Sequence, residues 1–331
     1  MSVATVSRVF NGYPDVSEQT RQRVFEVARE LDYAPSAAAR TLVTKRSHVV
    51  GIVLDTGEEH PDLQHPFFQE VLVALKRRLG AAGYDLLLYA TERPGNGSEP
   101  QSYLSRSRSH RVDGVVLMGV DAHDPSVRAL TNATIPCVAV DVDLVGRRAG
   151  YVMSDNVAGA REAVRHLHAL GHERIAIIGG PPATRPGADR LHGYRTELER
   201  LGLRYRDEYV EEGDFYPDSG YTAMQALLQL AEPPTAVFAA SDLMAAGAMR
   251  AAQERGVSVP GELSLVGFDD IQLAALMQPS LTTIRQDKTG LGNAAADAVT
   301  RMVDVADAAP AVVTLPVELV IRASTAAPRE T

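Results

Sequence analysis

Six side chains could together hold a small polar molecule. They are Phe68, Asp141, Arg190, Phe215, Ser241 and Asp269. The planar guanidinium of an arginine can bind two hydroxyls or a carboxylate through parallel hydrogen bonds. An ionised aspartate accepts hydrogen bonds from two hydroxyls, and phenylalanine rings can stack on an apolar ring face. These residue types favour a polyhydroxylated ligand.

Three of the six residues lie at the ends of predicted strands. Asp141 ends the apolar run 136–142, and Ser241 and Asp269 follow the runs 236–240 and 263–267. Ligands in open α/β sheets bind beyond the carboxyl ends of the strands, so we expect these side chains to meet in a cleft.

Neighbouring residues have plainer interpretations. We expect Asp242 to be only a helix N-cap and Asp270 to be a solvated loop charge. For Phe68, a position at the cleft and a position in the core both stay open. We also expect that Arg190→Ala abolishes ligand response while leaving the fold intact.

Apolar strands alternate with amphipathic helices through most of the chain. The first series has strands at 48–55, 86–90, 115–120 and 136–142, with helices from Pro66, near Tyr103 and from Pro125. The second series has helices at 157–170, 188–201, 219–230 and 242–255 between strands at 174–179, 209–213, 236–240 and 263–267. A tail adds strand 281–285, helix 288–305 and strand 312–321. Such alternation predicts two doubly wound parallel sheets, and therefore two lobes.

The N-terminal segment has a different pattern, that of two short helices. Ser2 is a good N-cap for a helix with Val3, Val6 and Phe10 on one stripe. The other face carries Ala4, Thr5, Ser7, Arg8 and Asn11. Ser17 can cap a second helix, whose buried stripe would be Val24, Val27, Ala28 and Leu31.

The polar face of the first helix could read DNA. Arg8 can form a bidentate pair with a guanine, and Val3 or Ala4 can contact a thymine methyl group in the major groove. An ordinary helical hairpin with a solvated face is the commoner explanation of such a pattern. The spacing alone therefore favours the hairpin.

The order of short motifs favours DNA binding. Residues 2–12 (SVATVSRVFNG), 16–21 (VSEQTR), 33–36 (YAPS) and 37–42 (AAARTL) resemble the DNA-binding headpiece of the LacI/GalR family of bacterial transcriptional repressors. The resemblance implies that the helix after Ser2 is the recognition helix and that about residues 36–44 form a hinge helix. In that hinge Ala39 and Leu42 would contact DNA, with Leu42 wedged into the minor groove. Packing of Leu42 against the headpiece stays open as an alternative.

The resemblance continues through the body. It is densest at VDG (112–114), LGHERI (170–175), RLHGY (190–194), SDLMAAG (241–247), VGFDD (266–270) and LTTI (281–284). These motifs are similar to the family's effector domain, which resembles periplasmic sugar-binding proteins. The resemblance implies that the six residues named at the outset line the effector pocket.

The expected architecture is an α/β protein with two doubly wound lobes behind an incomplete helix-turn-helix headpiece. We assign residues 1–47 to the headpiece and 48–331 to the effector domain. The first lobe would hold about 48–150 and 281–309, and the second about 151–280 and 310–326. The resemblance implies that the chain returns to the first lobe near residue 281.

The headpiece departs from the family at its start. The family headpiece has three helices, and this chain begins inside the second. We expect that the start codon has been assigned too late; a shortened regulator is the alternative. Without the headpiece, the chain would be a stand-alone sugar-binding protein.

Composition is compatible with this assignment. The 331 residues include 45% hydrophobic ones and one cysteine, Cys137, with no apolar run long enough to span a bilayer. The net charge is −9, but residues 1–48 carry +2. We therefore expect a cytoplasmic protein without disulfides whose acidic excess lies away from DNA.

The expected function is ligand-controlled binding of a near-palindromic operator by a homodimer. No phosphate-binding glycine loop, zinc-protease or serine-hydrolase motif is present, so an enzyme is disfavoured. The acidic residues and histidines of 58–65 lack metal-ligand spacing, so we expect no metal and no cofactor.

Overall fold

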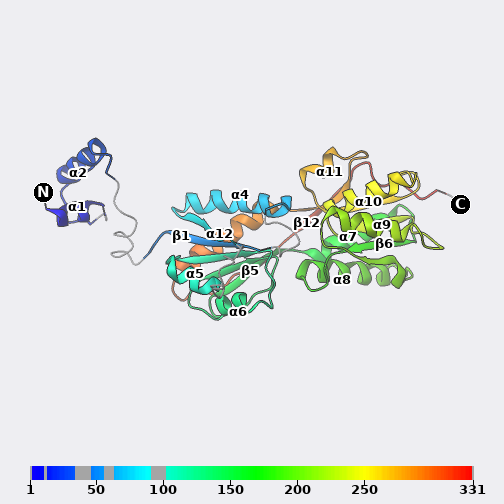
Figure 1. Ribbon diagram of the computed structural model, residues 1–331, viewed down its shortest axis with the longest axis horizontal. Helices are drawn as coiled ribbons and strands as arrows, with labels where there is room; N and C mark the ends of the chain where they lie inside the picture. Colours follow the sequence, from blue (N-terminus) through cyan, green and yellow to red (C-terminus); the bar gives the residue numbers. More distant parts are fainter. Residues whose placement is uncertain (1, 11–12, 34–45, 56–62, 91–101, 330–331) are drawn as a thin grey trace, which may run out of the picture.

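The computed structural model describes residues 2–10, 13–33, 46–55, 63–90 and 102–329 (Figure 1). Two N-terminal helices, α1 (Val3–Phe10) and α2 (Glu18–Glu30), precede two lobes that lie end to end. The expected hinge segment and Asn11 lie outside the described residues, as do Ala39 and Leu42.

Both N-terminal helices begin at the predicted caps. The Thr5 amide donates to Ser2 Oγ at 3.2 Å, and the Thr20 amide donates to Ser17 Oγ at 3.3 Å. The predicted stripes are correct only in part. Val24 is buried, but Leu31 is 71% exposed because it lies beyond the end of α2.

The first lobe is built on a parallel six-stranded sheet in the order β11-β5-β4-β3-β1-β2. Its strands are β1 (Val49–Leu54), β2 (Asp85–Leu88), β3 (Gly114–Met118), β4 (Cys137–Val140), β5 (Ala149–Ser154) and β11 (Val312–Leu315). Helices α4 (Pro66–Ala81) and α12 (Lys288–Asp304) cover one face, and α5 (Tyr103–Ser109) and α6 (Pro125–Thr131) cover the other.

The second lobe has a six-stranded sheet in the order β12-β10-β9-β8-β6-β7, in which only the β10–β12 pair is antiparallel. Its strands are β6 (Ile175–Gly179), β7 (Val210–Glu212), β8 (Ala236–Ala239), β9 (Ser264–Asp269), β10 (Thr282–Gln286) and β12 (Val317–Val320). Its helices are α7 (Asn156–Ala169), α8 (Arg185–Arg200), α9 (Pro217–Leu227), α10 (Asp242–Glu254) and α11 (Gln272–Leu276), with a 3-10 turn, η1, at Asp207–Tyr209.

Each sheet separates two apolar cores. In the first lobe Ile52 and Leu54 face α4 and α12, while the alternate residue Val53 faces α5 and α6. In the second lobe Val237 and Phe238 divide in the same way between the two faces of β8. Because both faces are buried, strands read as continuous apolar runs.

The chain crosses between the lobes at three places, each a few residues later than expected. β10 pairs with β9 and β12, so the expected return to the first lobe near residue 281 is wrong, and the crossing follows Gln286. The predicted strand 312–321 is two strands that belong to different sheets, divided at Pro316. Proline cannot donate to a sheet ladder, which explains the break.

β5 was not expected, and it extends the first lobe to Ser154. The strand has little sequence signal because it begins Ala149-Gly150. A Cβ on Gly150 would lie 2.1 Å from the carbonyl oxygen of Ala311, so only glycine permits this close approach. Gly150 thus weakens the strand pattern in the sequence, yet it is required for β5 to pack against Ala311.

Candidate functional site

A cleft of about 680 Å³ lies between the lobes, at the carboxyl ends of the strands. β1, β3 and β4 of the first lobe lead into it, as do β6, β7, β9 and β10 of the second. This position follows from topology, because parallel strands end at the same edge of a sheet and their loops gather there.

Five of the six predicted residues line the cleft. They are Phe68, Asp141, Arg190, Phe215 and Asp269. Ser241 does not line it, and its side chain is fully buried. Its Oγ caps α10 by accepting from the Met244 amide at 3.0 Å and donates to the Phe215 carbonyl at 2.9 Å. Ser241 therefore positions the loop that carries Phe215.

Arg190 is only 3% exposed and lies among aromatic and polar partners. Its Nε donates to Asn156 Oδ1 at 2.9 Å, and its Nη1 donates to the Ala240 carbonyl at 2.5 Å. The guanidinium lies 3.7 Å above the ring centroid of Phe268 and 3.8 Å from Asp269 Oδ1. Burial lowers the pKa of Arg190, although neighbouring carboxylates partly offset this effect.

Asp141 follows β4 with a positive φ of 59° and is 8% exposed. Its Oδ1 is buried and has no hydrogen-bond partner within the described residues. Burial raises the pKa of Asp141 to about 6, against the opposing effects of Arg190 and a backbone hydrogen bond from Ser154. A group with an unmet hydrogen bond in a cleft is suited to contact a ligand.

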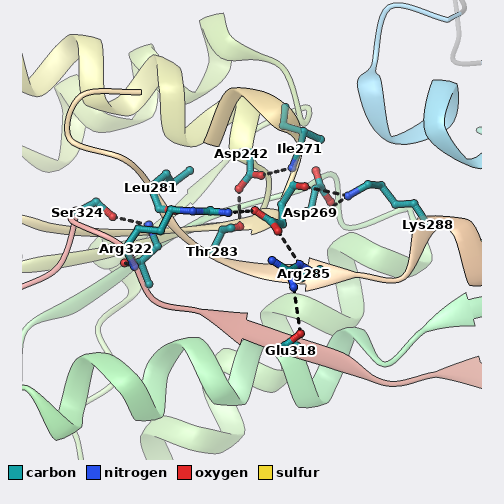
Figure 2. Close-up of polar contacts among 12 residues, drawn as sticks. Asp242, Asp269, Ile271, Leu281, Thr283, Arg285, Lys288, Glu318, Arg322 and Ser324 are labelled. Carbon is teal, nitrogen blue, oxygen red and sulfur yellow. Dashed lines mark hydrogen bonds and ion pairs between the residues drawn. The ribbon is translucent and has the colours of Figure 1, made fainter. Parts of the chain in front are cut away.

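Asp269 ends β9 in a strained turn. Its φ is +115° and that of Asp270 is +52°, conformations that cost roughly 1–3 kcal/mol each and persist only where neighbouring groups hold them. Lys288 Nζ donates to the carbonyls of Asp269 at 2.6 Å and Asp270 at 3.0 Å (Figure 2). Gln286 Nε2 donates to Asp269 Oδ1 at 2.7 Å. Lys288 thus holds the backbone of this turn, and Gln286 holds the Asp269 carboxylate.

Asp270 and Asp242 stabilise the same turn, contrary to the plain roles expected of them. Asp270 accepts from Arg285 at 2.7 Å and from Arg322 at 2.5 Å. Burial raises the pKa of Asp270, but these two hydrogen bonds more than offset it and the pKa is lowered. Asp270 is therefore a paired charge and not a solvated one.

Asp242 is fully buried, and Ser241 takes the N-cap position that was assigned to it. Its Oδ2 accepts from the Ile271 amide at 2.9 Å, and its Oδ1 accepts from the Thr283 hydroxyl at 2.5 Å. Burial and the charge of Asp269 raise the pKa of Asp242 well above its usual value. Asp242 therefore joins the turn after β9 to β10.

Phe215 lies over a glycine of the opposite loop. A Cβ on Gly180 would lie 2.2 Å from the Phe215 ring, so glycine is needed where the ring packs. Phe215 itself has a φ of +74°. The glycine–proline turn at 179–182 therefore accommodates an aromatic ring at the cleft.

Sequence reasoning missed several residues of the cleft. The first lobe adds Asp55, His65, Phe67, Tyr103, Asp121 and Asp143, and the second adds Thr184, Arg185, Asp214, Tyr216 and Gln286. Many of them follow a strand by one to three residues, and this position was the available signal. Phe68 lines the cleft and also packs at the margin of the core, so both interpretations hold in part.

Among the described residues, the contacts that join the lobes at the cleft include an ion pair and a ring pair, in addition to those of Lys288. Arg185 Nη1 of the second lobe donates to Asp143 Oδ2 of the first lobe at 2.8 Å. The rings of His65 and Tyr216 meet edge to face, with centroids 5.5 Å apart. All four residues line the cleft.

The polar face of α1 is exposed as predicted at Ser2, Ala4, Ser7 and Arg8, and Thr5 is half-buried. Arg8 forms an ion pair with Asp15 and lies 5.4 Å from the ring centroid of Tyr13. The Arg8 guanidinium is thereby oriented at the surface of the helix pair.

Among the described residues, no cluster of three or more histidine, cysteine and carboxylate side chains could hold a metal ion. The acidic residues of 58–62 lie outside the described ranges. No helix of the described chain is long and apolar enough to cross a membrane.

The fold and the cleft define a two-lobed ligand-binding protein of the periplasmic-binding-protein type that carries a helix-turn-helix segment. Residues 164–325 match the periplasmic binding protein-like domain, and residues 1–36 match the bacterial regulatory proteins of the lacI family.

Relatives are similar along nearly the whole chain. The HTH-type transcriptional regulator CelR of Thermobifida fusca is 38% identical over 291 residues, covering 87% of this chain and 84% of CelR. A solved CelR–cellobiose complex has a TM-score of 0.75 and 32% identity, covering 98% of this chain and 96% of that one. The lac repressor dimer bound to operator and an anti-inducer has a TM-score of 0.84 and 31% identity, covering 99% and 96%. The chain belongs to the LacI family and is a transcriptional regulator.

Proposed function

We propose that this regulator represses transcription as a homodimer on a near-palindromic operator in the cytoplasm, and that a sugar in the cleft controls its DNA affinity. The observation that carries the proposal is the cleft itself. Side chains of both lobes converge there, and the N-terminal helix pair matches a DNA-binding family. A ligand that prefers one arrangement of the lobes shifts the population toward it.

A polyhydroxylated ligand suits the chemistry of the cleft. Asp141 and Asp269 offer carboxylate oxygens, and Phe68 and Phe215 offer ring faces. CelR, a relative, has been solved with cellobiose, so cellobiose is a reasonable first probe. We propose no enzymatic role, because the matching family and the relatives are transcriptional regulators.

The DNA-contacting residues that we propose remain those of the sequence analysis. They are Ser2, Val3, Ala4, Thr5, Ser7, Arg8, Asn11, Ala39 and Leu42. The exposed face of α1 supports the first part of this assignment. Small residues in that face leave room for sequence-dependent DNA shape to contribute to specificity.

The alternative function is that of a sugar-binding protein without DNA-binding activity. In the described headpiece, Tyr13, Leu31 and Tyr33 are all more than 40% exposed. A helix pair with this much exposed apolar surface is poorly stabilised by its own packing. The exposed apolar surface of the helix pair therefore supports the alternative function.

The test measures ligand and DNA binding with the same protein. A thermal-shift screen of sugars and purines identifies a stabilising ligand; at 100 times Kd a ligand adds about 2.7 kcal/mol of stability. Selection from random duplexes then identifies the operator. We expect a near-palindromic site whose affinity changes roughly 5–150-fold with ligand, and weaker DNA binding without loss of ligand affinity for Leu42→Ala. Sugar binding without any preferred duplex would instead support the alternative function.

A further inference from the structure

The charged side chains that line the cleft are mostly negative. Seven are aspartates: Asp55, Asp121, Asp124, Asp141, Asp143, Asp214 and Asp269. Only two arginines, Arg185 and Arg190, and no lysine line the cleft within the described residues. A hollow lined by one sign of charge concentrates the field in its interior, and that field opposes ligands of the same sign.

Both arginines are already paired with protein groups. Arg185 Nε donates to both carboxylate oxygens of Asp189, at 2.9 and 2.8 Å, and its Nη1 donates to Asp143 at 2.8 Å. Arg190 donates to Asn156 and to the Ala240 carbonyl and lies beside Asp269. An anionic ligand would have to compete with these partners for Nε and Nη1 of each arginine.

The helix N-termini at the cleft offer few amides to an anion. Of the helices that begin there, α4, α6, α8 and α9 each have a proline in the first two positions, whereas α5 has no proline but its Ser105 amide donates to Ser102 Oγ at 3.2 Å. These prolines are Pro66, Pro125, Pro186 and Pro217. Proline has no N–H group, so each removes one of the donors that make a helix N-terminus attractive to phosphate.

Side chains occupy further amides of the same helices. His65 Nδ1 accepts from the Phe67 amide at 3.3 Å, and Thr184 Oγ1 accepts from the Gly187 amide at 3.2 Å. In α6 the cap is a carboxylate, with Asp124 Oδ1 accepting from the Ser126 amide at 2.6 Å. Proline and side-chain caps thus reduce the number of free amides at α4, α6 and α8, whereas α9 has the proline but no side-chain cap.

Two acceptor atoms of the cleft have unmet hydrogen bonds. Asp141 Oδ1 and Gln286 Oε1 are buried without a partner among the described residues, and the two side chains are 8% and 2% exposed. Hydroxyl or amino groups can supply the missing donors, whereas a phosphate dianion or a carboxylate cannot. The ligand that completes the site is therefore rich in donors.

We infer that the cleft discriminates by charge, taking neutral or amine-bearing polyhydroxylated molecules and rejecting their phosphorylated and carboxylated counterparts. The inference rests on the proposed sensor function and names the ligand class of that site. It predicts that the signal is the free saccharide and not its phosphate or acid form.

The test uses sugars that share a skeleton and differ in charge. Binding to the whole protein is measured by calorimetry at pH 7.5 and low salt for cellobiose against cellobionate, and for glucose and glucosamine against glucose 6-phosphate. We expect the anionic member of a binding set to be weaker by on the order of 100-fold, and glucosamine to bind at least as well as glucose.

A variant pair tests whether the charge of the cleft is the cause. Asp121→Asn with Asp124→Asn removes two charges and keeps side-chain acceptors for the His123 and Ser126 amides. We expect this variant to narrow the ratio between neutral and anionic sugars by roughly threefold to tenfold at low salt, and less at high salt. Asp85→Asn, at the start of β2 and so at the opposite edge of the sheet, should leave the ratio unchanged.

Three outcomes would overturn the inference. An anionic sugar that binds as tightly as its neutral counterpart refutes charge discrimination while leaving the sensor function standing. An unchanged ratio in the double variant shows that the aspartates are not its cause. Failure of every sugar to bind refutes the polyhydroxylated class, and with it the sugar part of the proposed function.

Discussion

The buried charges of the second lobe, at the cleft and behind it, are paired, whereas Asp141 of the first lobe is buried with one carboxylate oxygen unmet. Arg190, Asp242 and Asp270 of the second lobe each have two or more hydrogen-bond partners. Asp141 of the first lobe has a buried oxygen without one among the described residues. The paired charges of the second lobe therefore stabilise the empty protein, whereas Asp141 of the first lobe favours the ligand-bound protein.

The two lobes therefore have different roles at the cleft. A paired network is preorganised and holds strained residues such as Asp269 in place before a ligand arrives. A buried carboxylate with an unmet hydrogen bond destabilises the empty protein and is relieved by a donor on the ligand. Substitutions in the second lobe should therefore weaken the fold, and some substitutions in the first lobe should strengthen it.

The largest effect is expected for Arg190→Ala. Removing one partner of a buried charge cluster typically costs about 3–5 kcal/mol, because the remaining carboxylates stay buried without it. This expectation replaces the intact fold suggested by sequence alone, since Arg190 is only 3% exposed and stacks on Phe268. The free energy of unfolding from urea titration provides the measurement.

Arg195→Ala serves as the control on the same helix. Arg195 is exposed and bonds only to the Tyr205 hydroxyl and ring within the described contacts. Its loss should cost less than about 1 kcal/mol. Equal losses for the two variants would contradict the idea that the second lobe depends on its buried network.

Asp141→Asn should have the opposite sign. The pKa of Asp141 is raised from 3.8 to about 6, so the folded protein binds this proton more tightly than the unfolded chain does. The associated stability is fully present below about pH 4 and is lost as the pH rises through 6. At pH 7.5 the ionised side chain therefore costs up to about 3 kcal/mol, a cost that the neutral amide of the variant would not incur.

The stability of Asp141→Asn should be compared with that of the parent between pH 4 and pH 8. We expect a gain at pH 7.5 that disappears near pH 4, together with weaker sugar binding because the carboxylate is lost. Asp143→Asn, which alters a half-exposed carboxylate paired with Arg185, should give no such gain. A destabilised Asp141→Asn at pH 7.5 would show that the carboxylate is satisfied in the empty protein.

The sequence was informative where local pattern and topology agree. Strand ends pointed to Asp141 and Asp269, because carboxyl ends of parallel strands share one edge. The same argument placed Ser241 at the cleft because it follows a strand, but its hydroxyl turns back to cap α10. Position along a strand predicts the neighbourhood of a side chain, but not the direction in which it points.

Long-range partners could not be predicted from one sequence. Asp242 has the local pattern of an N-cap, and its bonds to Ile271 and Thr283 depend on segments about 30 and 40 residues away. The division at Pro316 was likewise hidden within a ten-residue apolar run that serves both sheets. Hydrophobic pattern reports burial, while the sheet to which a strand belongs depends on tertiary packing.

The smallest stability effect is expected for Phe68→Ala, and its neighbour provides a matched comparison. Phe67 is 5% exposed in the first-lobe core, so Phe67→Ala should cost about 3–5 kcal/mol. Phe68 is half-buried at the cleft, so its truncation should cost about 1 kcal/mol while weakening sugar binding at least roughly tenfold through loss of a stacking face. Urea unfolding and calorimetry on both variants separate the two roles. If Phe68→Ala bound sugar like the parent, the aromatic contribution of the first lobe would lie with other rings of the cleft.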